Sequence, residues 1–132
     1  MEVRCPYCGE QAILTDSSEV YHGKSYGMIW ICRPCKAWVG THKNSKRHVP
    51  LGRLANAELR RWKIKAHDAF DDLWNRKMNR DRCSKTEART AGYSWLAAEL
   101  GIKEDDCHIG MFDVPMCRKA VDVCVRIRTK EG

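Results

Sequence analysis

The feature that most constrains this chain is a pair of Cys-x-x-Cys motifs near its N-terminus. Cys5 and Cys8 form the first motif, and Cys32 and Cys35 form the second. Each motif lets two thiolates converge on one ion, and four sulfur ligands complete the tetrahedral coordination typical of structural Zn²⁺ sites. The intervening residues 9–31 are long enough to form two β-strands between the motifs. The sequence therefore predicts one structural zinc ion held by all four cysteines.

Other interpretations of these motifs are a redox-active dithiol, a disulfide pair or an iron site with the same ligands. The chain begins without an apolar signal core, which favours a reducing compartment where paired cysteines more often bind metal. Doubling of the motif favours zinc over the alternatives. We expect residues 1–40 to depend on the ion for folding.

Short apolar runs in the first forty residues predict β-strands. Residues 11–15 and 27–31 can pair as a hairpin around the polar segment 16–24. Gly9 follows the first motif, where a tight turn often needs a positive φ. Helix signals dominate only after a basic connector, residues 43–55.

Three helices are expected beyond this connector. The first spans about residues 56–77, with Asn56 as its N-cap. Its apolar stripe, at spacings of three and four residues, comprises Leu59, Trp62, Ala66, Phe70 and Leu73. The second begins at Ser84 in a capping-box pattern and ends at Gly101, with a bend expected at Gly92.

The third helix should follow Asp113 as its N-cap, with Pro115 in its first turn. The cysteines outside the two motifs show no further Cys-x-x-Cys spacing and are expected to pack as small apolar residues: Cys83, Cys107, Cys117 and Cys124. The predicted fold is α+β, a small N-terminal zinc-ribbon-like β module packed on a C-terminal three-helix unit. The expected boundaries are residues 1–42, 43–55 and 56–132.

Several motifs occur in an order that is more specific than any one of them. They are CPYCG, WICRPCKAWVGTH, PLGRLANAELRRWKIKAHDAFDDLW, YSWLAAELGI and CHIGMFD. This order resembles a bacterial and phage family described as a zinc-finger-containing domain, over about residues 4–125. The resemblance implies zinc at the four motif cysteines, and the family carries no established activity.

The chain is basic, with a formal net charge of +7 and a pI near 9.1. Four thiolates and one zinc ion would reduce the net charge to about +5. Basic residues that could neutralise phosphates gather in and just after the connector: Lys43, Lys46, Arg47, Arg53, Arg60 and Arg61. Aromatic residues of the β module could stack on unpaired bases. A solvated basic face beside an aromatic core explains the same pattern.

A second constellation contains His67, Asp71, Cys107 and His108. His67 and Asp71 stand four residues apart on one predicted helix, so they could form part of a second metal site or an acid–base pair. A local His–Asp hydrogen bond that fixes the helix is the simpler interpretation. The chain contains no Walker loop, GxGxxG or HExxH motif, so the sequence does not require catalysis.

The leading hypothesis is a zinc-stabilised nucleic-acid-binding adaptor. The alternative is a protein-interaction module, such as a phage-encoded inhibitor of a host protein, and a small metal-dependent hydrolase is the third. DNA and RNA are not distinguished. Apolar runs are only a few residues long, so we expect no membrane contact and a cytoplasmic location in a bacterium or phage-infected cell.

Overall fold

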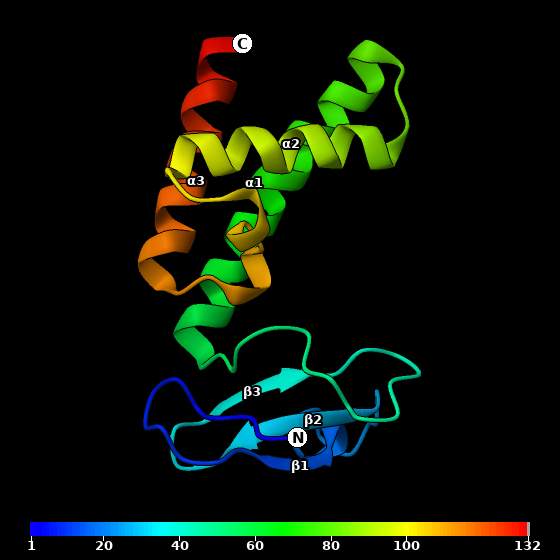
Figure 1. Ribbon diagram of the computed structural model, residues 1–132, viewed down its shortest axis with the longest axis vertical. Coiled ribbons are helices and arrows are strands. Elements are labelled where there is room, and N and C mark those ends of the chain that lie inside the picture. The colour runs from blue at the N-terminus through cyan, green and yellow to red at the C-terminus, as the bar shows by residue number, and fades with distance from the viewer. Residues whose placement is uncertain (132) are drawn as a thin grey trace. The chain divides into compact units, whose positions relative to one another are not determined.

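The computed structural model describes residues 1–131, with side chains through Thr129. The chain divides into two compact units, Met1–Arg60 and Arg61–Gly132. A three-stranded antiparallel sheet lies in the first unit, and three long helices follow it in the chain (Figure 1). The α+β fold class expected from the sequence is confirmed.

The sheet has the strand order β1-β2-β3, with β1 at Ile13–Asp16, β2 at Met28–Cys32 and β3 at Ala37–Gly40. The predicted hairpin corresponds to β1 and β2, which pair antiparallel. The third strand was not predicted. It follows the second Cys-x-x-Cys motif after a short turn and pairs with β2.

Side chains alternate between the two faces of the sheet. Leu14, Trp30 and Val39 are register partners on one face, where they join a buried cluster. The buried members of this cluster are Val3, Cys5, Ala12, Trp30, Cys32, Ala37, Val39 and Leu54. Cys5 and Cys32 therefore belong to the apolar core of this unit, and Cys35 packs against it.

The segment between β1 and β2 includes a short 3-10 helix, η1, at Ser17–Glu19. The first long helix, α1, spans Ala57–Asp81 and extends past its predicted end. Asn56 caps it as expected, since its Oδ1 accepts a hydrogen bond from the Leu59 amide at 3.0 Å. Leu59, Ala66 and Phe70 are buried, which confirms the apolar stripe.

The second long helix, α2, spans Lys85–Leu100 and ends at Gly101 in the left-handed conformation. Ser84 is its N-cap, and its hydroxyl accepts from the Glu87 amide at 3.1 Å. The helix continues through Gly92. A Cβ there would lie 3.1 Å from the Phe70 ring, so the absence of a side chain permits a close approach between α1 and α2.

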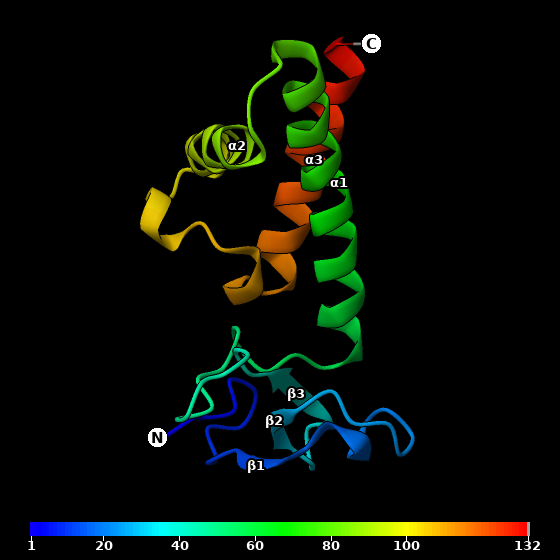
Figure 2. The ribbon, with the colours of Figure 1, turned by 90° about the vertical axis from the view of Figure 1, so that its right-hand side faces the viewer.

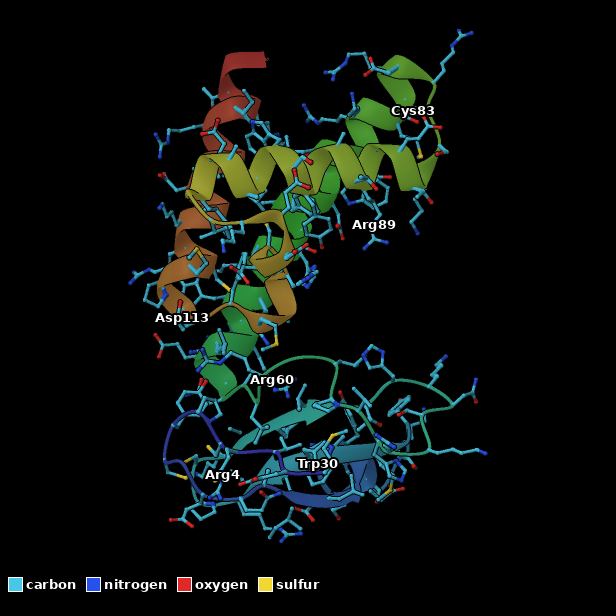
Figure 3. The ribbon with its side chains drawn as sticks, in the orientation of Figure 1. Arg4, Trp30, Arg60, Cys83, Arg89 and Asp113 are labelled. Carbon is cyan, nitrogen blue, oxygen red and sulfur yellow. The ribbon has the colours of Figure 1, made fainter. Side chains whose placement is uncertain are left out.

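Two short 3-10 helices, η2 (Glu104–Asp106) and η3 (Ile109–Met111), lead to α3 at Val114–Glu131. The Asp113 carboxylate accepts from the Met116 amide at 2.9 Å, as predicted for an N-cap (Figure 3). In the second unit, α2 crosses α1 and α3 (Figure 2). No helix in the described part of the chain has the length and apolarity needed to cross a membrane.

Candidate functional site

The first Cys-x-x-Cys motif lies in a tight turn before β1. The Gly9 amide donates to the Cys5 carbonyl at 2.8 Å, and the Cys5 amide donates to Glu10 at the same distance. Gly9 has φ 79°, in the left-handed region that glycine adopts without steric cost. This turn holds Cys5 in the core and leaves Cys8 exposed.

The second motif forms the connection between β2 and β3. Cys32 is the last residue of β2, and the Lys36 amide closes the turn by donating to the Arg33 carbonyl at 3.1 Å. Lys36 follows Cys35 as Gly9 follows Cys8, and it too has a positive φ, 53°. The two motifs therefore use a left-handed residue at equivalent positions.

The four sulfur atoms converge on a single point. Each lies within 4.8 Å of the others, and Cys8 Sγ is 3.7 Å from Cys32 Sγ. Zn–S bonds of about 2.3 Å in a tetrahedron place neighbouring sulfurs about 3.8 Å apart, so this spacing fits zinc. All eight cysteines of the chain are free thiols. The predicted zinc ligands Cys5, Cys8, Cys32 and Cys35 thus form one closed structural site.

When no metal is bound, contacts among the four cysteines shift the pKa values of the Cys5, Cys32 and Cys35 thiols. The neighbouring Cys8 thiol is the main cause that raises the pKa of Cys35 to about 12. A backbone hydrogen bond at Cys35 lowers the pKa of Cys32, but burial and contacts with the Cys5 and Cys8 thiols outweigh it, so this pKa is also raised. Burial raises the pKa of Cys5, but backbone hydrogen bonds at Tyr7 and Cys8 outweigh it, and the net shift is downward. Cys32 and Cys35 must therefore lose protons before all four sulfurs can bind one Zn²⁺ as thiolates.

The second predicted constellation does not form a cluster. The four sulfurs just described are the one group of potential metal ligands found among the described residues. Asp71 Oδ1 accepts from Trp74 Nε1 at 2.7 Å, within α1. His67 and His108 are exposed, whereas Cys107 is buried and burial raises its pKa. Cys117 and Cys124 are buried on α3, as expected for packing residues.

Residues 41–50 form a structured loop after β3, here called the basic loop. Thr41 and Pro50 form an isolated bridge at its base, and the His42 amide donates to the Val49 carbonyl at 2.9 Å. Trp30, in the centre of the sheet, donates from Nε1 to the His48 carbonyl at 2.7 Å (Figure 3). The loop is thus attached to the same core that contains the zinc ligands.

The six predicted basic residues fall into two groups. Lys43, Lys46 and Arg47 are exposed on the basic loop. Arg61 is also exposed, on α1.

Arg53 and Arg60 are instead half-buried against aromatic rings of the first unit. The Arg53 guanidinium lies 5.8 Å from the Tyr7 ring centroid. That of Arg60 lies 3.2 Å from the Trp38 ring centroid and donates to the Trp38 carbonyl (Figure 3). Burial lowers the pKa of Arg60 to about 10, so its guanidinium is still protonated at pH 7.

The second unit contains a groove of about 320 Å³ between its helices. The apolar and aromatic side chains of its lining come mainly from α1 and α2, with Ile127 from α3. Lys77 and Arg80 lie in the lining, and Lys85 and Arg89 lie 5.6 and 5.8 Å from the Trp74 ring centroid. Phe70 is predicted from sequence as a packing residue of the apolar stripe, and the spacing of such residues does not indicate an open groove.

Comparison with known families gives one match that spans both units. The model of a zinc-finger-containing domain matches residues 1–127. Neither curated proteins nor solved structures give a match. The matched range includes all four zinc ligands and all three helices. With the closed four-cysteine site and the α+β fold in place, the chain belongs to the family described as zinc-finger-containing domain.

Proposed function

We propose that this protein is a zinc-stabilised nucleic-acid-binding adaptor whose basic loop contacts phosphates. One observation carries the proposal: Lys43, Lys46 and Arg47 are exposed together on a loop that Trp30 ties to the core containing the zinc ligands. Lysine and arginine side chains bind phosphates through charge, without reading base sequence. A preformed loop also loses little conformational entropy on binding.

The other basic residues have different parts in this proposal. Arg61 supplies a further exposed phosphate contact on α1. Arg53 and Arg60 contribute positive charge while their guanidinium groups remain against Tyr7 and Trp38. The zinc ion has a structural role, since its four protein ligands leave no coordination position for a substrate.

The test is fluorescence anisotropy with labelled single- and double-stranded DNA and RNA over a range of salt concentrations. We expect binding that weakens steeply with salt. Lys46→Glu combined with Arg47→Glu should weaken binding about tenfold or more and flatten the salt dependence. The single variant Lys46→Glu is compared with Lys103→Glu, at an exposed residue of the second unit, because both change the net charge by the same amount. Unchanged affinity of the double variant would exclude the basic loop as the contact surface.

Binding of a protein partner is the second candidate, and the groove of the second unit favours it. Its lining combines Phe70, Trp74 and Trp95 with the basic residues Lys77 and Arg80. Charge complementarity points to an acidic segment that places one large apolar side chain in the groove. A phage-encoded inhibitor of a host protein would use such a surface. Absence of polynucleotide binding at low salt would make this the leading function.

A further inference from the structure

A second candidate binding surface lies on the face of the sheet opposite the core that contains the zinc ligands. A cavity of about 350 Å³ opens there, and Ile31 and Trp38, which are register partners on β2 and β3, belong to its lining. The remaining lining residues are Glu19, Val20, Arg33 and Lys36. Arg33 is paired with Glu19, so the exposed Lys36 supplies the net positive charge of this cavity.

Aromatic rings continue from this cavity toward solvent. The Tyr21 ring lies 5.2 Å from the Trp38 ring and 5.0 Å from the Tyr26 ring, edge-on in both contacts. Tyr26 is 68% exposed and Tyr21 is 41% exposed. Exposed rings of this size are costly in water, and they offer flat surfaces for another ring. We call Tyr21, Tyr26 and Trp38 the aromatic surface. Arg60 already lies over the Trp38 ring, so the two exposed tyrosine rings are the ones that can stack on a base.

Hydrogen bonds hold the segment that carries these tyrosines. The Tyr26 amide donates to the buried Ser17 hydroxyl at 2.6 Å, and the Ser17 amide donates to Gly27 at 2.9 Å. Arg33 binds the Glu19 carboxylate with two contacts, at 2.7 and 2.9 Å. The aromatic surface is therefore positioned before any ligand binds, which lowers the entropic cost of stacking.

We propose that the aromatic surface and the adjoining cavity bind unpaired bases of a single-stranded polynucleotide, with Lys36 beside the strand's phosphates. This inference rests on the proposed nucleic-acid function and specifies its substrate class. Bases of a duplex are stacked on one another and hide their faces, whereas unpaired bases can stack on tyrosine or tryptophan. The basic loop contacts phosphates and does not itself distinguish the two forms.

The experiment compares four labelled probes by anisotropy at one salt concentration: a 20-nucleotide oligo-dT, the matching oligo-U, a 20-base-pair duplex, and an abasic strand with the same phosphates. We expect oligo-dT or oligo-U to bind more tightly than both the duplex and the abasic strand. The pyrimidine strand that binds more tightly is then used as the preferred strand for the variant below. Equal affinity for the oligo-dT and abasic probes would overturn the inference.

Tyr26→Ala is the decisive variant, because this ring is highly exposed and its loss should leave the fold intact. It should weaken binding of the preferred strand roughly 5- to 150-fold, leave duplex binding unchanged, and be rescued by Tyr26→Phe. Circular dichroism and zinc content check its folding. If Tyr26→Ala binds every probe like the unmodified protein, the aromatic surface is excluded while the basic loop is not. If the unmodified protein binds none of the four probes, both proposals are wrong.

Discussion

Lys36 occupies a position where the backbone favours glycine. Its φ of 53° lies in the left-handed region, at the same place after its motif that Gly9 occupies after the first. A left-handed conformation costs a residue with a Cβ about 1–2 kcal/mol, and glycine avoids this cost but loses more entropy on folding. Only the first of these two turns was predicted from sequence, because glycine marks such a position and lysine does not.

Replacing Lys36 with glycine should therefore stabilise the second motif. We expect Lys36→Gly to raise the free energy of unfolding of the zinc-bound protein by about 0.5–1 kcal/mol, measured by denaturant titration. Gly9→Ala should lower it by a similar amount, since a Cβ there meets no atom within 4 Å and the cost is conformational. A loss of stability in Lys36→Gly would show that the lysine side chain contributes more than its backbone costs.

Secondary structure elements were predictable where their signals are local. Ser84 and Asp113 accept the cap hydrogen bonds that their sequence positions indicate. The third strand, Ala37–Gly40, is as short as the predicted strand β1, and it was missed because its formation depends on pairing with β2 rather than on a local signal. Its pairing depends on β2, which is already held by the hairpin with β1.

The cap of α2 gives a prediction at the scale of one helix. Ser84→Ala removes the acceptor of the Glu87 amide and should lower the free energy of unfolding by about 1 kcal/mol. Ser84→Asp keeps an acceptor and adds a negative charge at the helix N-terminus, so it should be at least as stable as the serine protein. Thermal and denaturant unfolding of the three proteins test this order. Equal stability of all three proteins would show that water satisfies the Glu87 amide as well as a side chain does.

The candidate site shows the same division between local and long-range information. The four zinc ligands were identified because Cys-x-x-Cys spacing alone specifies how two thiolates converge. The contact between Trp30 and the His48 carbonyl and the contact between Tyr21 and Trp38 join residues far apart in sequence. No local pattern indicates such contacts, so neither the shape of the basic loop nor the aromatic surface could be predicted.

At the scale of the whole molecule, the two units differ in their dependence on zinc. The first has a core that includes zinc ligands, whereas the second buries residues such as Phe70, Leu96 and Phe112 without them. Chelation at pH 7 should unfold residues 1–60 and preserve most of the helical circular dichroism signal. Hydrogen exchange by mass spectrometry would locate the loss of protection.

Matched cysteine variants sharpen this prediction. Cys5→Ser should lose zinc and the structure of the first unit, whereas Cys83→Ser, in the α1–α2 connection (Figure 3), should retain both. Zinc must displace protons from Cys32 and Cys35, whose pKa values are raised in the metal-free cluster. Zinc affinity should therefore fall as the pH falls from about 8 to 6. A folded, zinc-free Cys5→Ser protein would contradict the structural role of the ion.

The indole of Trp30 contacts both the core that contains zinc ligands and the backbone of the basic loop. Its ring packs in the core with Cys5 and Cys32, and its Nε1 donates to the backbone of the basic loop at His48. We therefore expect metal loading to affect whether the loop keeps the shape described here. If zinc increases the affinity of the loop for a polynucleotide, the bound polynucleotide must increase the affinity for zinc by the same factor. The protein would then release its nucleic acid when a cell runs short of zinc.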